Sequence, residues 1–244
     1  MGRMIFLFKL CLRLAIVVVI AWGLFIDLYS AFGAFQSWQL LYYTNLSNLA
    51  VMLLFIYLIV KALRNKQETN QASYRQYLPS SEQLKMALTW AISITGIVWH
   101  IALAPALDEH IAQGGKVIQA LPASFDMVEF MLSVSLLHTW SPLLVFLDWL
   151  LFSPKKRLPL YTPLTWLLIP LGYFAFICAW VQGIGPVNAE LHITYPYPFI
   201  DFSAYPATQI GCNIAIIAVG AVVLGYIYWG INWLLGKIFS KHLA

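Results

Sequence analysis

The chain has 244 residues, of which 61% are hydrophobic and only 10% are charged. A soluble domain carries about 25% charged residues, so this composition excludes an ordinary water-soluble surface and indicates lipid as the solvent. The net charge of +4 is compatible with a nucleic-acid partner. However, the charges stand at the ends of apolar runs, so we expect a membrane protein with no nucleic-acid surface.

Six apolar runs follow one another, and each is long enough to cross a bilayer as a helix, which takes roughly 20 residues. The first run is too long for the roughly 7–15 apolar residues of a signal peptide, so we expect it to be retained as a helix. The fold class is therefore an all-α integral membrane protein, a six-helix bundle in one domain over residues 1–244. The predicted helices cover about 12–34, 39–63, 84–105, 124–151, 160–182 and 207–236.

The segments between and near the ends of the apolar runs contain residues that predict where helices start and end. Ser80 and Ser81 beside Glu82 resemble a helix start, and Pro105 is predicted to end the third helix. The three cysteines lie in apolar runs, where we expect small buried side chains. The long segment 183–206 is stiffened by prolines. Its aromatic residues are expected at the headgroup level: Tyr195, Tyr197 and Phe199.

The positions of the lysines and arginines predict the orientation. With both termini in the cytoplasm, six helices place every Lys and Arg except Lys116 on the cytoplasmic side. Such a bias sets topology strongly, and five or seven helices would scatter the same charges over both sides. We therefore predict a multi-pass membrane protein with both termini cytoplasmic.

Polar side chains inside the apolar runs cost free energy in hydrocarbon, so each is expected to face a partner, a cavity or a reaction. In the predicted topology they concentrate toward the outer side, which indicates a pocket that opens outward. The residues concerned are Asp27, Thr44, Asn45, Ser47, Asn48, His100, Asp126, Glu129, His138 and Asn213.

Helical spacing groups some of these residues, although each group also has a purely structural reading. Thr44, Ser47 and Asn48 share one helix face. Threonine often bonds to a carbonyl one turn earlier, and Ser or Asn often join helices. Asp126 and Glu129 open the fourth helix, where carboxylates favour the positive end of the helix dipole. His138 lies mid-helix and is either a satisfied core residue or a functional one.

Three strings resemble the bacterial six-helix branch of the androgen-induced-gene and androgen-dependent TFPI-regulating protein group. They are YYTNLSNL (42–49), LLHTWSPLLVFLDWLLF (136–152) and YPYPFIDFSAYP (195–206). The resemblance implies an intramembrane hydrolase with a threonine nucleophile and a histidine partner. Animal members cleave fatty acid esters of hydroxy fatty acids. Carried over by motif, the nucleophile falls on Thr44 and the histidine on His138.

This pairing is chemically reasonable, because a threonine hydroxyl is a weak nucleophile that needs an adjacent base. Asn45, Asn48 and Ser47 are candidate donors to the oxyanion. Asp126, Glu129, Asp27 and His100 are candidates to orient the histidine, with no preference among them. The expected substrate is a lipid or amphipathic acyl ester that arrives from the outer leaflet of a bacterial cytoplasmic membrane. No cofactor or metal is expected.

The predicted depths of the two residues disagree. Measured from the outer helix ends, Thr44 lies about 5 residues deep and His138 about 14, a difference of some 13 Å. The pair can meet only if the fourth helix begins nearer Phe130, if the second begins higher, near Gln36, or if the helices tilt.

Three alternatives stay open at this level. A zinc-dependent hydrolase would draw its ligands from His100, His110, His138, His192, Asp126 and Glu129, although no tight His pair is present. A non-catalytic lipid or small-molecule carrier would also need an outward polar pocket. Finally, an acyltransferase would use the same covalent threonine intermediate.

Overall fold

The computed structural model describes residues 2–64, 80–112, 119–155 and 157–241. Helices dominate the described part of the chain, which contains no β-strand, and six of them are long and apolar enough to cross a membrane. This confirms the all-helical fold and the six spans. The spans cover Arg3–Phe32, Tyr43–Arg64, Ser81–Glu109, Met127–Phe152, Thr162–Gly183 and Ala207–Ile238.

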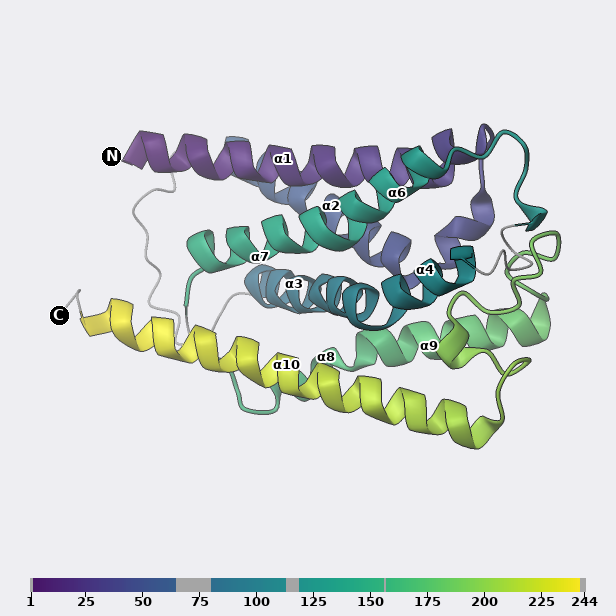
Figure 1. The fold of residues 1–244 in the computed structure, drawn as a ribbon. Coiled ribbons are helices and arrows are strands. Elements are labelled where there is room, and N and C mark those ends of the chain that lie inside the picture. The colour runs from purple at the N-terminus through teal and green to yellow at the C-terminus, as the bar shows by residue number, and fades with distance from the viewer. Residues whose placement is uncertain (1, 65–79, 113–118, 156, 242–244) are drawn as a thin grey trace.

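The helices run roughly side by side, and α1 begins at the same end of the bundle at which α10 ends (Figure 1). That arrangement is what an even number of spans requires. The bounds are α1 Gly2–Leu28, α2 Tyr43–Arg64, α3 Ser80–Val98, α4 Ala104–Ala112, α6 Met127–Ser135, α7 Ser141–Phe152, α8 Thr162–Trp166, α9 Leu168–Gly183 and α10 Ala207–Lys241. The first helix begins earlier than predicted, and the third starts at the predicted serines.

Pro105 does not end the third span, contrary to our prediction. A π-helical turn, Trp99–Leu103, joins α3 to α4, and the helix continues to Ala112 with Pro105 inside it. A second π-helical turn, Leu136–Trp140, joins α6 to α7 just before Pro142. Proline offers no N–H and its ring crowds the carbonyl four residues earlier. In both spans the π-helical turn precedes the proline and lets the helix continue.

The connection between α1 and α2 is partly buried against the bundle. Two 3₁₀ turns, Ser30–Phe32 and Ser37–Leu41, carry the chain back from the far end of α1 before α2 begins (Figure 1). Ala31, Phe32, Gln39 and Leu41 are all less than 9% exposed. Because α2 starts below the end of the bundle, its first turn lies deep. The fourth helix begins at Met127, three residues closer to Phe130 than predicted, whereas the second begins later than predicted, at Tyr43.

The helices pack through two apolar clusters in the middle of the bundle. One is built around Trp90, Trp149 and Trp166 and joins α3, α7, α8 and α10. The other joins α1, α2, α3 and α7 around Ile16 and Phe55. The remaining large apolar side chains on the outside form the surface expected against lipid.

An ionic cluster, which the sequence analysis missed, lies buried near the end that holds the termini. The Arg13 Nε atom is 3.2 Å from Asp148 Oδ1, and Lys85 Nζ pairs with the other oxygen of the same carboxylate. All three side chains are at most 5% exposed. Arg13 and Lys85 were predicted as topology signals at helix ends. They also bind α1 and α3 to α7.

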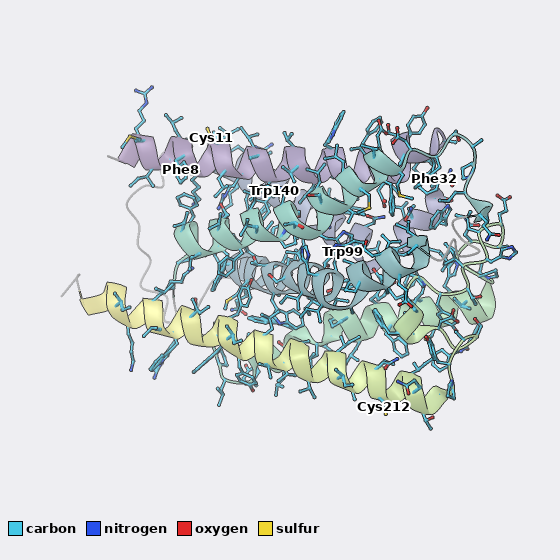
Figure 2. All side chains as sticks on the ribbon, in the orientation of Figure 1. Phe8, Cys11, Phe32, Trp99, Trp140 and Cys212 are labelled. Atoms are coloured by element: carbon cyan, nitrogen blue, oxygen red, sulfur yellow. The ribbon has the colours of Figure 1, made fainter. Side chains whose placement is uncertain are left out.

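The cysteines differ from expectation as well. Cys11 and Cys212 are exposed on the outer faces of α1 and α10 (Figure 2). Cys178 is half-buried. A thiol is apolar enough to face lipid, so burial inside the bundle is not required.

Candidate active site

The first turn of α2 and the π-helical turn between α6 and α7 bring Thr44 and His138 together. The Thr44 Oγ1 atom lies 3.1 Å from His138 Nε2, a hydrogen-bond distance. The Thr44 side chain is buried, and its hydroxyl contacts His138 rather than a carbonyl one turn earlier. Because α2 begins at Tyr43, below the end of the bundle, Thr44 lies deeper than its residue count from the predicted helix end suggested.

The second nitrogen of the same ring fixes the tautomer. His138 Nδ1 lies 3.1 Å from the Val134 carbonyl oxygen. A carbonyl can only accept, so Nδ1 carries the proton in this bond. In a neutral imidazole, Nε2 then holds a lone pair and accepts from the Thr44 hydroxyl. The orienting group is thus a backbone carbonyl, where we had expected an acidic side chain or His100.

Tyr197 is a third member of the site that the sequence analysis placed at the headgroup level. Its side chain is buried, as is that of Tyr195. The Tyr197 hydroxyl accepts a hydrogen bond from the Thr44 backbone N–H at 3.2 Å and lies 3.4 Å from Thr44 Oγ1. Burial raises the pKa of Tyr197 to about 12, so the phenol stays protonated and can donate.

Asn48 joins the two halves of the site. Its amide donates to the carbonyls of Thr44 at 2.9 Å and Leu137 at 3.2 Å, and its oxygen accepts from Ser141 at 2.7 Å. Ser47 also donates to the Thr44 carbonyl, at 3.0 Å. Both side chains therefore bond to backbone carbonyls of the two turns that carry Thr44 and His138.

Close packing holds the histidine turn in place. A Cβ atom added at Gly96 of α3 would lie 2.8 Å from the His138 carbonyl oxygen, and one added at Gly23 of α1 would lie 2.7 Å from Leu137. The Trp99 ring, which Figure 2 shows in the middle of the bundle, packs on the imidazole with 4.5 Å between centroids. These contacts leave the ring little freedom to rotate.

Thr44 lines two cavities. The larger has a volume of about 570 Å³ and is lined by Thr44, His138, Asp27, Trp99 and residues of the segment 191–201. The smaller, of about 100 Å³, is almost wholly apolar and runs between α3, α9 and α10. Thr44, Tyr197 and Leu103 line both. Thr44 therefore borders both cavities.

Asp27 and Asn45 form a polar patch on the larger cavity, away from His138. The Asn45 amide donates to Asp27 at 2.6 Å and to the Gln39 carbonyl at 2.8 Å, and the Ser133 hydroxyl lies 3.5 Å from Asp27. This patch makes no hydrogen bond to the imidazole, and the Asn45 amide is already committed. The structure thus gives Asp27 a cavity-lining position and no orienting contact.

The remaining predicted residues lie elsewhere. Asp126 caps α6 by accepting from the N–H groups of Val128 and Glu129, as the helix-dipole reading predicted. Glu129 lies half-buried in the first turn of α6. His100 contacts Thr139 at 3.0 Å. Asn213 donates to the Phe199 carbonyl and so ties the long segment to α10.

The zinc alternative finds no ligand set in the described part of the chain. Nowhere in that part do three His, Cys, Asp or Glu side chains come together in a way that could hold a metal ion. The His110 side chain lies outside the described residues. The candidate ligands His100 and Asp126 make the separate local contacts given above, and Glu129 lies in the first turn of α6.

Comparison with known proteins finds no match among family models, curated proteins or solved structures. What the chain does must therefore be inferred from the site itself.

Sequence reasoning missed Tyr197 and the carbonyl that orients His138. The Tyr-Pro-Tyr-Pro run is visible in the sequence, but its aromatic residues match an interfacial belt equally well. Only the packing of this segment onto α2 shows that Tyr197 belongs to the site and not to an interfacial belt. The π-helical turn has a local signal in Pro142, four residues after His138.

Proposed function

We propose that the protein is an intramembrane hydrolase of fatty acyl esters, with Thr44 as nucleophile and His138 as general base. The observation that carries this proposal is the 3.1 Å contact between Thr44 Oγ1 and a His138 nitrogen that is free to accept a proton. It agrees with the activity implied by the resemblance to the androgen-induced-gene group.

In the first half of the reaction, Thr44 Oγ1 attacks the ester carbonyl while His138 Nε2 takes the hydroxyl proton. The tetrahedral intermediate collapses as the bond to the alcohol oxygen breaks, and Nε2 returns the proton to that oxygen. The products are an acyl-threonine and a free alcohol. General-base assistance of this kind contributes about 10²–10⁴-fold in rate.

In the second half, water attacks the acyl-threonine and His138 takes one proton from it. When the acyl bond breaks, the proton passes from Nε2 to Thr44 Oγ1, which releases the fatty acid and restores the site. If an alcohol replaces water, the same steps become acyl transfer. The polar patch at Asp27 and Asn45 makes the larger cavity the side from which water can reach the acyl group.

The oxyanion has donors other than the side chains we first considered. Tyr197 presents a phenol proton beside Thr44 Oγ1. The N–H groups in the first turn of a helix have no partner inside that helix, and the positive end of the helix dipole lies there. Asn45 stands in that turn of α2 and lines the larger cavity, whereas the Thr44 N–H already donates to Tyr197. Removal of one such donor typically lowers kcat by about 10²–10³-fold.

The two cavities suit the two arms of an ester. An apolar chamber on one side of Thr44 fits an alkyl chain, and the larger chamber with its polar patch fits the more polar arm. An ester with its carbonyl at Thr44 would place one arm in each. This supports a lipid ester as the substrate in preference to a small soluble one.

The test is hydrolysis of long-chain acyl esters by the purified protein in micelles, followed as release of fatty acid. Thr44→Ala is expected to lower kcat by at least about 10³-fold, and His138→Gln by about 10²–10⁴-fold. Thr44→Ser keeps the hydroxyl and should retain measurable turnover. Thr89→Ala is the matched control, because the Thr89 hydroxyl bonds to its own helix at Lys85.

Turnover by Thr44→Ala equal to that of the parent would overturn the proposal. A parent that binds acyl esters in the cavity and hydrolyses none would instead identify a carrier.

A further inference from the structure

A third cavity lies at the end of the bundle that holds both termini, and it is separate from the proposed active site. Its volume is about 510 Å³, and it lies between the turn after α7 and the last turns of α10. Its lining includes Lys155 and Arg157 from the turn and Trp229, Trp233 and Lys237 from α10.

The lining of this cavity is basic. Lys155, Arg157 and Lys237 contribute three cations from two different elements, and none of the described residues that line it is acidic. Basic residues near a membrane surface are usual, since they set topology. Here they surround a hollow, which topology alone does not require. A concave cluster of cations is an anion site in chemical terms.

The two walls of the cavity, the turn after α7 and helix α10, are in direct contact. The Trp229 indole donates to the Leu158 carbonyl at 3.1 Å, and a Cβ atom added at Gly236 would lie 2.8 Å from the Lys155 carbonyl oxygen. The turn and α10 are therefore in close contact at two places. The rings of Trp229 and Trp233 stack with 6.4 Å between centroids, which stiffens the α10 wall.

The Lys155 side chain is held in place by Trp149, and it forms no salt bridge with a carboxylate of the described residues. Its Nζ atom donates to the Trp149 carbonyl at 2.5 Å and lies 4.3 Å from the centroid of the Trp149 ring. Burial and the neighbouring Lys85 lower the pKa of Lys155 to about 8, while Glu82 and Asp148 oppose the shift. The amine is thus mostly protonated at neutral pH and gains from a nearby anion.

We propose that this cavity binds a phosphate group, and that its natural source is the headgroup of an anionic phospholipid. Phosphate oxygens accept charge-assisted hydrogen bonds from ammonium and guanidinium groups. Tryptophan side chains suit the interfacial depth at which such a headgroup lies. The predicted topology puts this end at the cytoplasmic leaflet, where basic pockets between helices hold anionic headgroups.

The experiment measures lipid retention by the full chain in detergent, using native mass spectrometry during titration with phosphatidylglycerol, and with phosphatidylcholine for comparison. A parallel titration uses inorganic phosphate alone. The Lys155→Gln/Arg157→Gln double variant removes two cations from the cavity. Lys61→Gln/Arg64→Gln is the matched control, because it removes two cations from the last turn of α2, outside the cavity.

The parent should retain phosphatidylglycerol over phosphatidylcholine. The double variant should bind phosphatidylglycerol at least about tenfold more weakly, and the control within about twofold of the parent. Binding of inorganic phosphate with the same dependence on the variants, and no lipid preference, would support the phosphate site with the free anion as its source.

Equal retention by the parent and the double variant, or an equal loss in the control, would overturn the proposal. Arg157→Gln alone serves as a second variant, because Arg157 is exposed. It should weaken phosphatidylglycerol binding about threefold or more, with unchanged thermal stability in the absence of lipid.

Discussion

At the scale of single residues, the candidate site depends on where a few hydrogen atoms lie. The Val134 carbonyl requires the proton of His138 on Nδ1, so Nε2 accepts from Thr44. The Thr44–His138 contact was expected from short motifs on different helices, and the structure brings these groups together. Tyr197 was not expected as a partner, because a tyrosine in a surface segment shows nothing in the sequence about the side chain it contacts.

Tyr197→Phe tests the phenol as a donor. The ring keeps its packing against Tyr42, Tyr173 and Phe199, so the fold should persist. Loss of the hydroxyl should lower kcat for ester hydrolysis by about 10²-fold, with a smaller effect on KM. Steady-state kinetics on the purified variant provide the measurement. An unchanged kcat would remove Tyr197 from the mechanism.

The pH dependence gives an independent check on the same residue. Because the pKa of Tyr197 is raised to about 12, the phenol is protonated throughout the range in which activity can be measured. The parent should therefore lose no activity through this group below about pH 10, near the ordinary pKa of tyrosine. Tyr197→Phe should lower the whole pH–rate profile without changing its shape. Loss of an alkaline limb in the variant would contradict this.

At the scale of elements, the apolar runs predicted the helices well but not their interruptions. Hydrophobic length is a local property, so the six spans were recognised from the sequence. The π-helical turns and the inward path of residues 29–42 depend on contacts with other helices. Pro105 illustrates the limit, since a proline ends many helices but here follows a π-helical turn that accommodates its ring.

Gly96→Ala tests whether the packing of α3 against the π-helical turn positions His138. The new methyl group would lie 2.8 Å from the His138 carbonyl oxygen and 3.3 Å from Pro142 Cγ, so the turn must shift. Overpacking of this kind costs roughly 1–3 kcal/mol. A displacement near 1 Å lowers activity by about 10²-fold. Gly96→Ala should therefore lower both the midpoint of thermal unfolding and the rate of hydrolysis.

Gly172→Ala is the control for this substitution. Gly172 lies in α9 with no heavy atom within 4 Å of an added Cβ, so the change should leave activity near that of the parent. Equal activity of both variants and the parent would show that the contact at Gly96 does not position the histidine.

At the scale of the whole molecule, polar groups divide into two centres toward opposite ends of the bundle. One surrounds Thr44 and His138, and the other is the ionic cluster of Arg13, Lys85 and Asp148. The sequence analysis located the first, because its residues are costly in hydrocarbon. It missed the second, because cations near helix ends are also what topology requires. The cytoplasmic location of the termini stays a prediction from charge bias.

Asp148→Ala tests the role of the ionic cluster in stability. The substitution leaves Arg13 and Lys85 buried without their shared carboxylate. Breaking a buried pair by removing one partner typically costs about 3–5 kcal/mol. The midpoint of thermal or detergent-induced unfolding should fall accordingly. Glu190→Gln, at an exposed carboxylate of the long segment, is the control and should leave the midpoint unchanged.

If the Thr44 hydroxyl is an activated nucleophile, it should be modified covalently by an electrophilic probe. The purified protein is treated with a fluorophosphonate probe, and the modified atom is located by peptide mass spectrometry. We expect one adduct on Thr44, which forms much more slowly in His138→Gln and is absent in Thr44→Ala. Labelling of Thr44→Ala at the rate of the parent, or an adduct on another residue, would contradict it.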